Sequence, residues 1–189
     1  MSIKPIRQRI AIALLLTLLG HHGLAQTWTQ SSAPETNWTS VACSADGSKI
    51  AAVTCCLGLV YLSTNSGMTW SSCDAPLTNY QSVSVSADGT TLIASASQGV
   101  FFVSTNGGTS WTVSEMPGAS CYSFGCSADG VKWIVGGQAC VSLSKNAGAT
   151  WNTDTNFVFE LVASSAEGEI LMGYETMRAM TFSSDSGMS

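Results

Sequence analysis

Short runs of β-branched and apolar residues alternate with polar turns along most of the chain. The first unit has such runs at residues 41–44, 50–54, 59–63 and 69–72, separated by turns containing Asp-Gly, Leu-Gly and Asn-Ser-Gly. Runs of this length between turn residues are typical of strands joined by hairpins. No part of this region has the 3.6-residue period of an amphipathic helix. The pattern therefore predicts an all-β protein.

An eight-residue segment with the pattern Ser-x-Asn/Asp-x-Gly-x-Thr/Ser-Trp recurs at intervals of 41, 40 and 39 residues. The fourth copy reaches its seventh position at Ser189. Thr27-Trp28, 42 residues before Trp70, has the form of the end of another copy and could supply the fourth strand of the last unit. The complete or partial copies are box 1 (residues 63–70), box 2 (104–111), box 3 (144–151) and box 4 (183–189).

A second motif, Ser-Ala-Asp/Glu-Gly, keeps the same phase and begins at Ser44, Ser86, Ser127 and Ser165. Two motifs in step over four copies indicate that each copy is one supersecondary unit. Four short strands per unit predict a β-propeller built of four-stranded blades. The four visible repeats predict a small closed ring or a fragment of a larger propeller, and both possibilities stay open at this point.

The boxes have a structural explanation. An Asn or Asp side chain can bond to backbone amides within its own turn, glycine accepts a positive φ, and the tryptophan can pack between neighbouring sheets at the start of the fourth strand. In the second motif, Asp46, Asp88 and Asp129 are predicted to shape Asp-Gly hairpins. The residues assigned to the structural role in the boxes are Ser63, Asn65, Gly67, Trp70, Ser104, Asn106, Gly108, Trp111, Ser144, Asn146, Gly148, Trp151, Ser183, Asp185 and Gly187.

The N-terminal segment has the order of a secretory signal peptide. Basic residues precede an apolar run at residues 10–19, and Gly23-Leu24-Ala25 follows it. We therefore expect residues 1–25 to be a signal peptide cleaved near Ala25, and the protein to be secreted or periplasmic. Residues 26–189 are expected to form the propeller, with repeat units at about 28–70, 71–111, 112–151 and 152–189.

Composition narrows the function once this segment is set aside. Residues 26–189 contain 4 basic and all 12 acidic residues, and both histidines lie in the segment removed. Phosphate backbones and anionic lipids repel so acidic a protein, so we expect neither a nucleic-acid partner nor membrane insertion after cleavage. Without histidine the commonest general base and metal ligand are missing, and we expect no metal and no cofactor.

Seven cysteines in an exported chain suggest disulfides, because the compartment is usually oxidising. The odd number leaves at least one thiol unpaired within the chain, and the connectivity is open. Cys121 and Cys126 are five apart and Cys55-Cys56 are adjacent, so neither pair has a zinc or redox spacing.

Boxes 1 to 3 resemble the Asp-boxes, or BNR repeats, found in propellers of sialidases, sortilin-type receptors and photosystem II assembly factors. The resemblance covers about residues 27–189 and implies a propeller fold; the assembly factors imply a protein partner and the sialidases a glycan. Asn65, Asn106 and Asn146 stand where the family prefers Asp.

The resemblance to the sialidase propellers does not extend to the residues of a sialidase active site. Such a site needs three arginines around the substrate carboxylate, and only Arg178 remains after signal removal. We therefore expect a non-catalytic binding or assembly scaffold for a protein or glycan partner, with no catalytic residue assigned. A glycoside hydrolase-like propeller using two carboxylates is the alternative. The candidate binding residues lie in loops expected at one end of the propeller: Glu35, Asp74, Glu115, Asp154, Gln98, Gln138 and Glu175.

Overall fold

The computed structural model describes residues 29–56, 58–115, 121–137, 140–174 and 180–187. Residues Ser31–Ser189 form one compact unit, and the predicted signal peptide lies outside the described residues. The described residues are almost entirely strands and turns. They include no helix long and apolar enough to cross a membrane.

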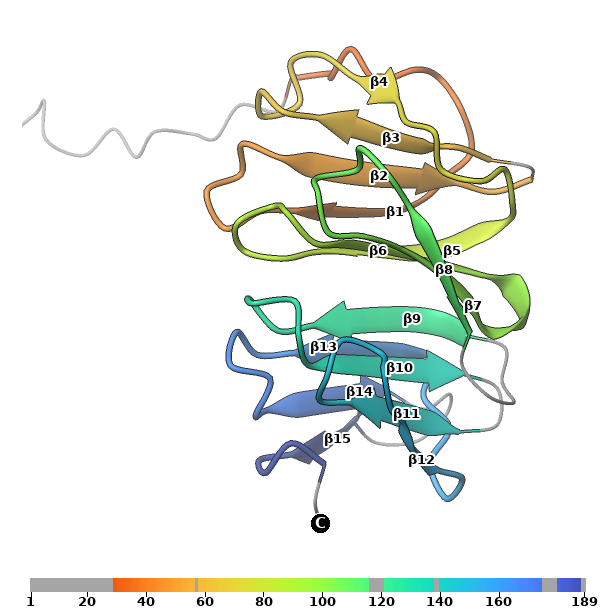
Figure 1. Ribbon diagram of the computed structural model, residues 1–189, viewed down its shortest axis with the longest axis vertical. Coiled ribbons are helices and arrows are strands. Elements are labelled where there is room, and N and C mark those ends of the chain that lie inside the picture. Colours follow the sequence, from red (N-terminus) through yellow and green to blue (C-terminus); the bar gives the residue numbers. More distant parts are fainter. Residues whose placement is uncertain (1–28, 57, 116–120, 138–139, 175–179, 188–189) are drawn as a thin grey trace, which may run out of the picture. The chain divides into compact units, whose positions relative to one another are not determined.

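The strands form four small antiparallel sheets, and the sheets are arranged as the blades of a propeller (Figure 1). Within each blade the strands pair in chain order, which confirms the predicted all-β propeller of Trp-containing repeats. Blade 1 contains β1 (Trp38–Cys43), β2 (Ile50–Thr54), β3 (Val60–Ser63) and β4 (Ser71–Ser72); blade 2 contains β5 (Tyr80–Val85), β6 (Leu92–Ala96), β7 (Val100–Ser104) and β8 (Thr112–Glu115); blade 3 contains β9 (Cys121–Cys126), β10 (Trp133–Gly137), β11 (Val141–Ser144) and β12 (Asn152–Asp154); blade 4 contains β13 (Leu161–Ser164), β14 (Leu171–Tyr174) and β15 (Met180–Ser183).

The Ser-Ala-Asp-Gly motif forms the turn between the first two strands of a blade. In blade 1 the Oδ1 atom of Asp46 accepts hydrogen bonds from the Ser44 hydroxyl at 2.6 Å and from the Ser48 amide at 3.0 Å. Gly47 has a φ of +70°, which glycine adopts without strain. Hydrogen bonds to the ionised carboxylate favour that form, and they lower the pKa of Asp46 to about 2. The predicted hairpin role of this aspartate is therefore confirmed.

Boxes 1 to 3 each close the turn between the third and fourth strands. In box 1 the Ser63 hydroxyl accepts the Gly67 amide at 2.9 Å and donates to Asn65 Oδ1 at 3.0 Å. The same oxygen of Asn65 accepts the Thr69 amide at 2.9 Å, while Asn65 Nδ2 donates to Thr69 Oγ1 at 2.9 Å. The amide nitrogen thus has a partner, which is why Asn serves in this turn as well as Asp. Boxes 2 and 3 repeat these bonds.

Consecutive blades meet through their first strands. Strand β1 contacts β5, β5 contacts β9, and β9 contacts β13, whereas β13 and β1 share no contact of this extent. A series of main-chain hydrogen bonds also links the motif turns of neighbouring blades: the amides of Ala45, Ala87 and Ala128 each donate to the alanine carbonyl of the next blade, at 2.9, 2.7 and 2.7 Å, and the last acceptor is Ala166. The interfaces therefore run in series from blade 1 to blade 4.

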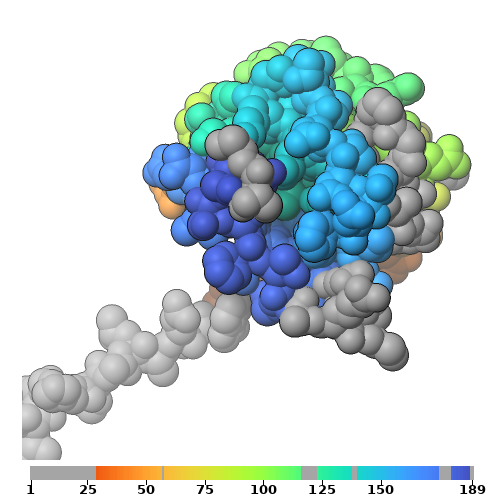
Figure 2. All heavy atoms as spheres, turned by 90° about the horizontal axis from the view of Figure 1, so that it is seen from below, coloured from red at the N-terminus to blue at the C-terminus, as the bar shows by residue number. Residues whose placement is uncertain are grey.

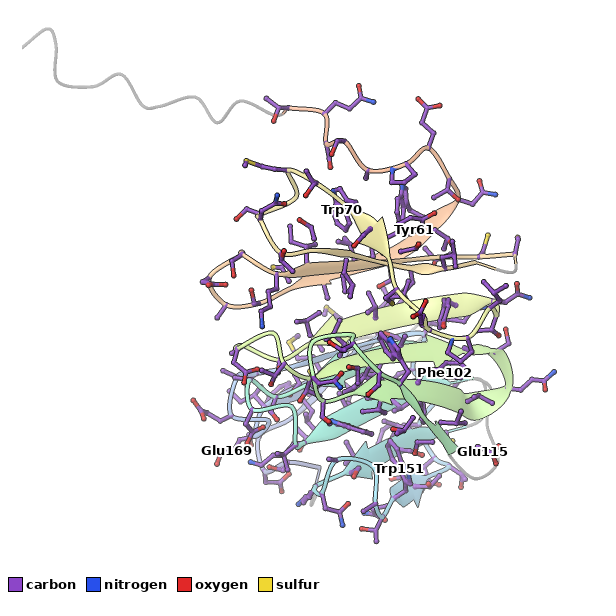
Figure 3. The ribbon with its side chains drawn as sticks, turned by 45° about the horizontal axis from the view of Figure 1, so that its top comes forward. Tyr61, Trp70, Phe102, Glu115, Trp151 and Glu169 are labelled. Carbon is purple, nitrogen blue, oxygen red and sulfur yellow. The ribbon has the colours of Figure 1, made fainter. Side chains whose placement is uncertain are left out.

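The hydrophobic core is divided into three clusters, one at each interface between blades. Alternate residues of a strand face opposite blades, so blades 2 and 3 each contribute to two clusters, whereas blades 1 and 4 each contribute to one. Trp111 packs against the first cluster and Trp151 against the second, as predicted for the box tryptophans. Trp70 differs, because no blade precedes blade 1 in the described structure. It instead contacts Trp38, with ring centroids 6.3 Å apart, at the top of Figure 3.

The expected disulfides are not found among the cysteines whose side chains are described, and all six are free thiols. Cys43 and Cys126 end the first strands of blades 1 and 3, so blade 2 lies between them. The nearest sulfur atoms belong to Cys55 and Cys56, at 3.0 Å. Cys73 follows β4 and Cys140 precedes β11, so the other described cysteines lie in different elements of the repeat.

Candidate functional site

The acidic loop residues singled out from the sequence lie at separate places along the series of blades. Glu35 precedes β1, Asp74 follows β4, and Glu115 and Asp154 are the last residues of β8 and β12. Each repeat unit of the sequence contains one of them, so the repeat spaces them along the propeller. Of these four residues, Asp154 lines a pocket described below. The glutamine Gln98 lies in the 3-10 turn Ser97–Gly99 with a φ of 68°, whereas Gln138 and Glu175 lie outside the described residues.

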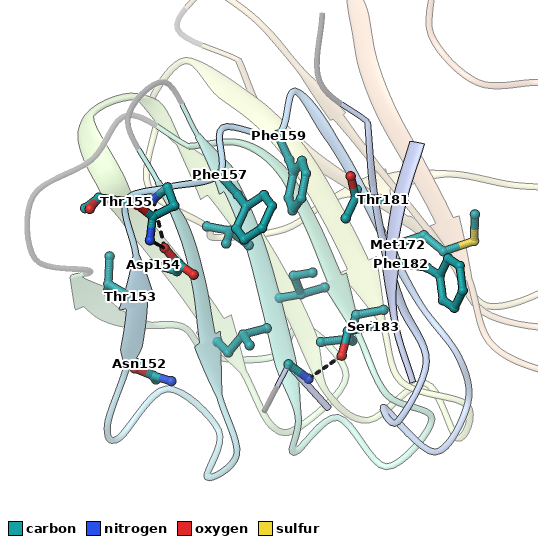
Figure 4. Close-up of a pocket in the computed structure, with 17 residues that line it drawn as sticks. Asn152, Thr153, Asp154, Thr155, Phe157, Phe159, Met172, Thr181, Phe182 and Ser183 are labelled. Carbon is teal, nitrogen blue, oxygen red and sulfur yellow. Dashed lines mark hydrogen bonds between the residues drawn. The ribbon is translucent and has the colours of Figure 1, made fainter. Parts of the chain in front are cut away.

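The pocket lies between blade 3 and blade 4 and has a volume of about 510 Å³ (Figure 4). Strands β11 and β12 and residues 155–159 form one side, and β14, β15 and box 4 form the other. Its apolar floor includes most of the third core cluster. The floor residues are Ile134, Val141, Leu143, Phe159 and Leu171.

Polar groups and an exposed aromatic ring form the rim. Asp154 Oδ1 accepts hydrogen bonds from the amide and the side-chain nitrogen of Asn156, both at 2.8 Å. Phe157 stacks on Phe159 with ring centroids 5.7 Å apart and an interplanar angle of 25°. Phe157 is 40% exposed, while Phe159 is buried. Figure 4 shows the two rings side by side, with Thr181 of β15 across from them.

The pocket occupies the place that a box tryptophan fills at the preceding interface. Trp151 of box 3 contacts Phe101 and Trp133, with ring centroids 5.7 and 6.0 Å apart. Their counterparts at the next interface are Val141, three residues before box 3, and Leu171, six residues after Ser165, and both line the pocket. The pocket therefore has the position and the apolar floor of an indole site.

An open strand edge runs beside the pocket. In blades 2 and 3 the third strand pairs with a fourth strand, so that Val103 lies opposite Thr112 and Leu143 opposite Asn152. In blade 4 the corresponding strand, β15, pairs with β14 along one edge. No strand pairs with its other edge in the described part of the chain. An extended segment lying there would have its backbone beside β15 and an alternate side chain in the pocket.

The lining residues limit the chemistry of the pocket. Asp154 is the one acid among the described lining residues, and they include no base. The described His, Cys, Asp and Glu residues form no group of three that could hold a metal ion. What the pocket offers is an apolar floor, an aromatic rim and a strand edge, which suit binding of an extended segment.

Of the binding candidates singled out from the sequence, Asp154 lines this pocket, and the other lining residues were not among those candidates. Phe157, Phe159 and Leu143 read as ordinary core or loop residues because no motif marks them. The signal was the repeat itself, because the neighbours of the box 3 tryptophan, Phe101 and Trp133, have counterparts one unit later in Val141 and Leu171. Comparing the neighbours of the tryptophans in boxes 2 and 3 with the fourth unit points to this pocket.

Comparison with known proteins gives a fold but no family. No family model matches the chain, and no curated protein matches it significantly. Among solved structures, the GH74 enzyme of Niastella koreensis is similar, with a TM-score of 0.70 and 19% identity, covering 84% of this chain and 24% of that chain.

Two further structures are similar over most of the chain. YCF48 bound to D1 peptide has a TM-score of 0.58 and 15% identity, covering 84% of this chain and 60% of that chain. Hydrazine synthase of Kuenenia stuttgartiensis has a TM-score of 0.64 and 13% identity, covering 86% and 49%. The chain thus spans less than two thirds of each of these proteins. It is a β-propeller structurally similar to propellers of an enzyme and of a peptide-bound protein.

Proposed function

We propose that the chain is an exported, non-catalytic β-propeller that binds a protein partner through an extended segment beside β15. The segment places an aromatic side chain in the pocket between blades 3 and 4. The observation that carries this proposal is the match between the pocket and the site of Trp151 one blade earlier, next to an open strand edge.

Energetics agree with an aromatic anchor. A buried tryptophan removes about 200 Å² from water, and at about 25 cal/mol per Å² this is worth up to about 5 kcal/mol. Main-chain bonds to β15 would add affinity and fix the direction of the segment. Part of this gain is offset by ordering the segment, so a short peptide should bind weakly and a longer partner more tightly.

The YCF48 structure supports a peptide or protein partner, since it contains a bound D1 peptide. At 15% identity the likeness shows the fold alone, so it does not identify the partner of this chain. It does show that a propeller of this type accommodates a peptide.

The enzyme alternative has less support. The GH74 enzyme shares the fold at 19% identity, and fold likeness does not transfer a reaction. Glycoside hydrolysis needs a pair of carboxyl groups about 5 to 9.5 Å apart. The described lining residues contribute Asp154, whose Oδ1 atom already accepts two hydrogen bonds from Asn156.

A glycan is the second candidate ligand, and one observation favours it. Phe157 presents a partly exposed ring, and Asn152 and Thr153 lie on the same rim. A flat apolar ring beside hydrogen-bonding groups suits a sugar, which has an apolar face and hydroxyl edges. In this case Phe157, rather than the floor of the pocket, would carry the affinity.

The test is a binding measurement with a labelled peptide of residues 150–156. This peptide contains Trp151 and the five residues that follow it in the chain. We expect binding by residues 31–189, the compact unit without Trp28, loss of binding when the peptide tryptophan is alanine, and at least tenfold weaker binding when Leu143→Trp fills the pocket of that unit. Val113→Trp, at an exposed position on β8, is the matched control and should bind normally.

Three outcomes contradict parts of the proposal. Binding to a glycan array that Phe157→Ala abolishes, with no peptide binding, would assign the site to a glycan. Turnover of an aryl glycoside, lost in Asp154→Asn, would make the protein an enzyme. An exported protein whose N-terminal sequence still begins at Met1 would contradict cleavage near Ala25.

A further inference from the structure

Blade 4 has an apolar face with no neighbour in the described structure. Its members are the exposed large hydrophobic residues of β13, β14 and β15, and the most exposed of them, Phe182, is 71% exposed. Several of them surround an apolar hollow on this face. In Figure 4, Met172 and Phe182 point away from Phe157 and Phe159. We call this the blade 4 face; it consists of Leu161, Met172, Tyr174, Met180 and Phe182.

The position of Phe182 is half-buried in the earlier blades. Phe182 precedes the serine of box 4, as Leu62 precedes that of box 1 and Leu143 that of box 3. The side chain of Leu62 meets Gly108 in box 2, and that of Leu143 meets Gly187 in box 4. Each of these residues therefore packs on the box of the following blade. Phe182 has the same place in blade 4, and the described residues contain no blade beyond blade 4.

Blade 1 exposes the complementary face. Val41 is 67% exposed, whereas its counterparts Val83 and Phe124, also three residues before the Ser-Ala-Asp-Gly motif, are 4% and 5% exposed. Those counterparts pack into the core cluster shared with the preceding blade. We call Trp38, Val41 and Cys43 the blade 1 face, since all three are exposed on β1.

The main-chain hydrogen bonds between blades end at the same two faces. Ala45, Ala87 and Ala128 each donate to the next blade, so the series begins with the carbonyl of Ala45 and ends with the amide of Ala166. Within the described residues, neither of these two groups has a hydrogen-bond partner. A blade 1 placed after blade 4 would allow the Ala166 amide to donate to an Ala45 carbonyl.

The N-terminal segment has the spacing to complete blade 4. Trp28 precedes Trp38 by ten residues, as Trp70 precedes Tyr80. Ser31, the first residue of the compact unit, lies beside box 1, because its hydroxyl donates to the Gly67 carbonyl at 3.1 Å. Trp28 thus has the sequence position of a box tryptophan belonging to a blade that precedes blade 1.

We propose that a second copy of the chain covers the blade 4 face, head to tail, with its own blade 1 face. Trp28 of the second copy enters the pocket between blades 3 and 4, and residues 26–30 lie beside β15. This rests on the proposed function, and it names the partner as another copy. Two copies joined at both ends form a closed dimer of eight blades with twofold symmetry.

One position makes this interface more apolar than those within the chain. Ser40 and Ser123 accept the amides of Val83 and Val162 of the next blade at 3.2 and 3.1 Å. The corresponding residue of blade 4 is Leu161, 62% exposed, which offers no hydroxyl. Burial of apolar area therefore replaces this hydrogen bond.

The test uses residues 26–189, which contain the whole compact unit from Ser31, and measures mass by light scattering after gel filtration. We expect a dimer. Phe182→Asp removes one face and Val41→Asp the other, so each variant should be a monomer. An equimolar mixture should regain dimers, because each variant keeps the face that the other lacks. Val113→Asp, 61% exposed on β8, should remain a dimer.

Trp28→Ala should weaken dimerisation at least tenfold if its side chain fills the pocket. A monomeric wild type at 100 μM protein, taken as about a hundred times a micromolar dissociation constant, would overturn the proposal. So would a Val41→Asp dimer together with a Phe182→Asp monomer, because that result means like faces meet. Unchanged dimerisation in Trp28→Ala overturns the role of the pocket.

A further measurement separates this inference from the proposed function. The pocket is free in a Val41→Asp monomer, so that variant should bind the peptide of residues 150–156. If the wild type is a monomer that binds the peptide, the proposal of a second copy as the partner is wrong and the proposed function stands. If the Val41→Asp monomer does not bind it, the proposed function fails even where the wild type is a dimer.

Discussion

The side-chain amide of Asn65 bonds to Thr69 at both of its ends: Oδ1 accepts the Thr69 backbone amide and Nδ2 donates to the Thr69 hydroxyl, each at 2.9 Å. The pair closes box 1 and sets the direction in which the chain enters β4. The same arrangement joins Asn106 to Ser110 and Asn146 to Thr150. In boxes 1 to 3 one asparagine side chain thus holds both the backbone and the hydroxyl of the seventh residue of the box.

Replacing Asn65 tests this role. Asn65→Ala removes two acceptor bonds and one donor bond, and we expect a loss of about 1 to 2 kcal/mol in the free energy of unfolding. Asn65→Asp should cost less than about 0.5 kcal/mol, because a carboxylate accepts the same amide and can accept the Thr69 hydroxyl. Urea denaturation measures both variants. Equal losses for Ala and Asp would show that the amide nitrogen is indispensable.

The aspartates of the second motif should make the free energy of unfolding depend on pH in the acidic range. Hydrogen bonds from Ser44 and Ser48 lower the pKa of Asp46 to about 2, and those from Ser86 and Thr90 do the same for Asp88. A pKa lowered by folding gives stability that is present above the unfolded value, near 3.9, and lost as the pH falls through the folded value. The urea midpoint should therefore drop between about pH 4 and pH 2.

The double variant Asp46→Asn, Asp88→Asn is the control for this titration. It removes both groups, so its urea midpoint should change less with pH over the same range. A wild type and a double variant with parallel pH profiles would mean that other groups cause the acid sensitivity.

Tryptophans at the same box position should contribute unequally. Trp151→Ala leaves a cavity beside Phe101 and Trp133, and we expect a loss of about 3 to 5 kcal/mol. Trp70→Ala should cost less in a monomeric background such as Val41→Asp, because Trp70 packs on Trp38 at the end of the series of blades. Thermal unfolding compares the two. A larger loss at Trp70 would show that blade 1 has a neighbour in the monomer.

Gly136 tests how closely blades 3 and 4 approach. A Cβ atom there would lie 2.4 Å from the Phe159 carbonyl oxygen and 2.9 Å from Val162 Cγ1. Gly136→Ala should therefore force the blades apart and cost about 1 to 3 kcal/mol. Gly47→Ala is a contrast, since its Cβ meets no atom within 4 Å and its cost comes from the positive φ alone. A neutral Gly136→Ala would mean that the interface is loosely packed.

The thiols should react in the order of their exposure and acidity. Burial raises the pKa of Cys126 to about 11, so its thiol stays protonated near neutral pH, whereas Cys43 is exposed. Iodoacetamide at pH 8 should modify Cys43 well before Cys126, and mass spectrometry of peptides measures both rates. In the dimer Cys43 lies in the interface, so its modification should slow relative to the Val41→Asp monomer.

The sequence predicts the blades well because one motif marks the turn between the first and second strands and the box marks the turn after the third strand. Asp46 and Asn65 each bond within a few residues of themselves, so local pattern is enough to predict their structure. The strand positions follow, since the strands fill the space between these turns.

The site was harder to predict because it depends on contacts between blades. Val141 and Leu171 are 30 residues apart in the sequence. They come together only when β11 of blade 3 packs against β14 of blade 4, and no local pattern predicts that contact. Loop acids such as Asp74 and Glu115 stand out in sequence because they are charged, yet repetition separates them in space. The exposed face of blade 4 could not be predicted from the sequence for a similar reason. Phe182 is exposed, yet its counterpart in blade 2, Val103, is half-buried, so the residue type at this position does not indicate exposure.

The bonds that join Ala45, Ala87, Ala128 and Ala166 are made by the main chain alone. A link of this kind demands no particular side chain on either partner, only a turn of the correct shape. These links would form equally well after a repeat unit is duplicated, so the hydrogen bonds between blades do not limit the number of units in the series.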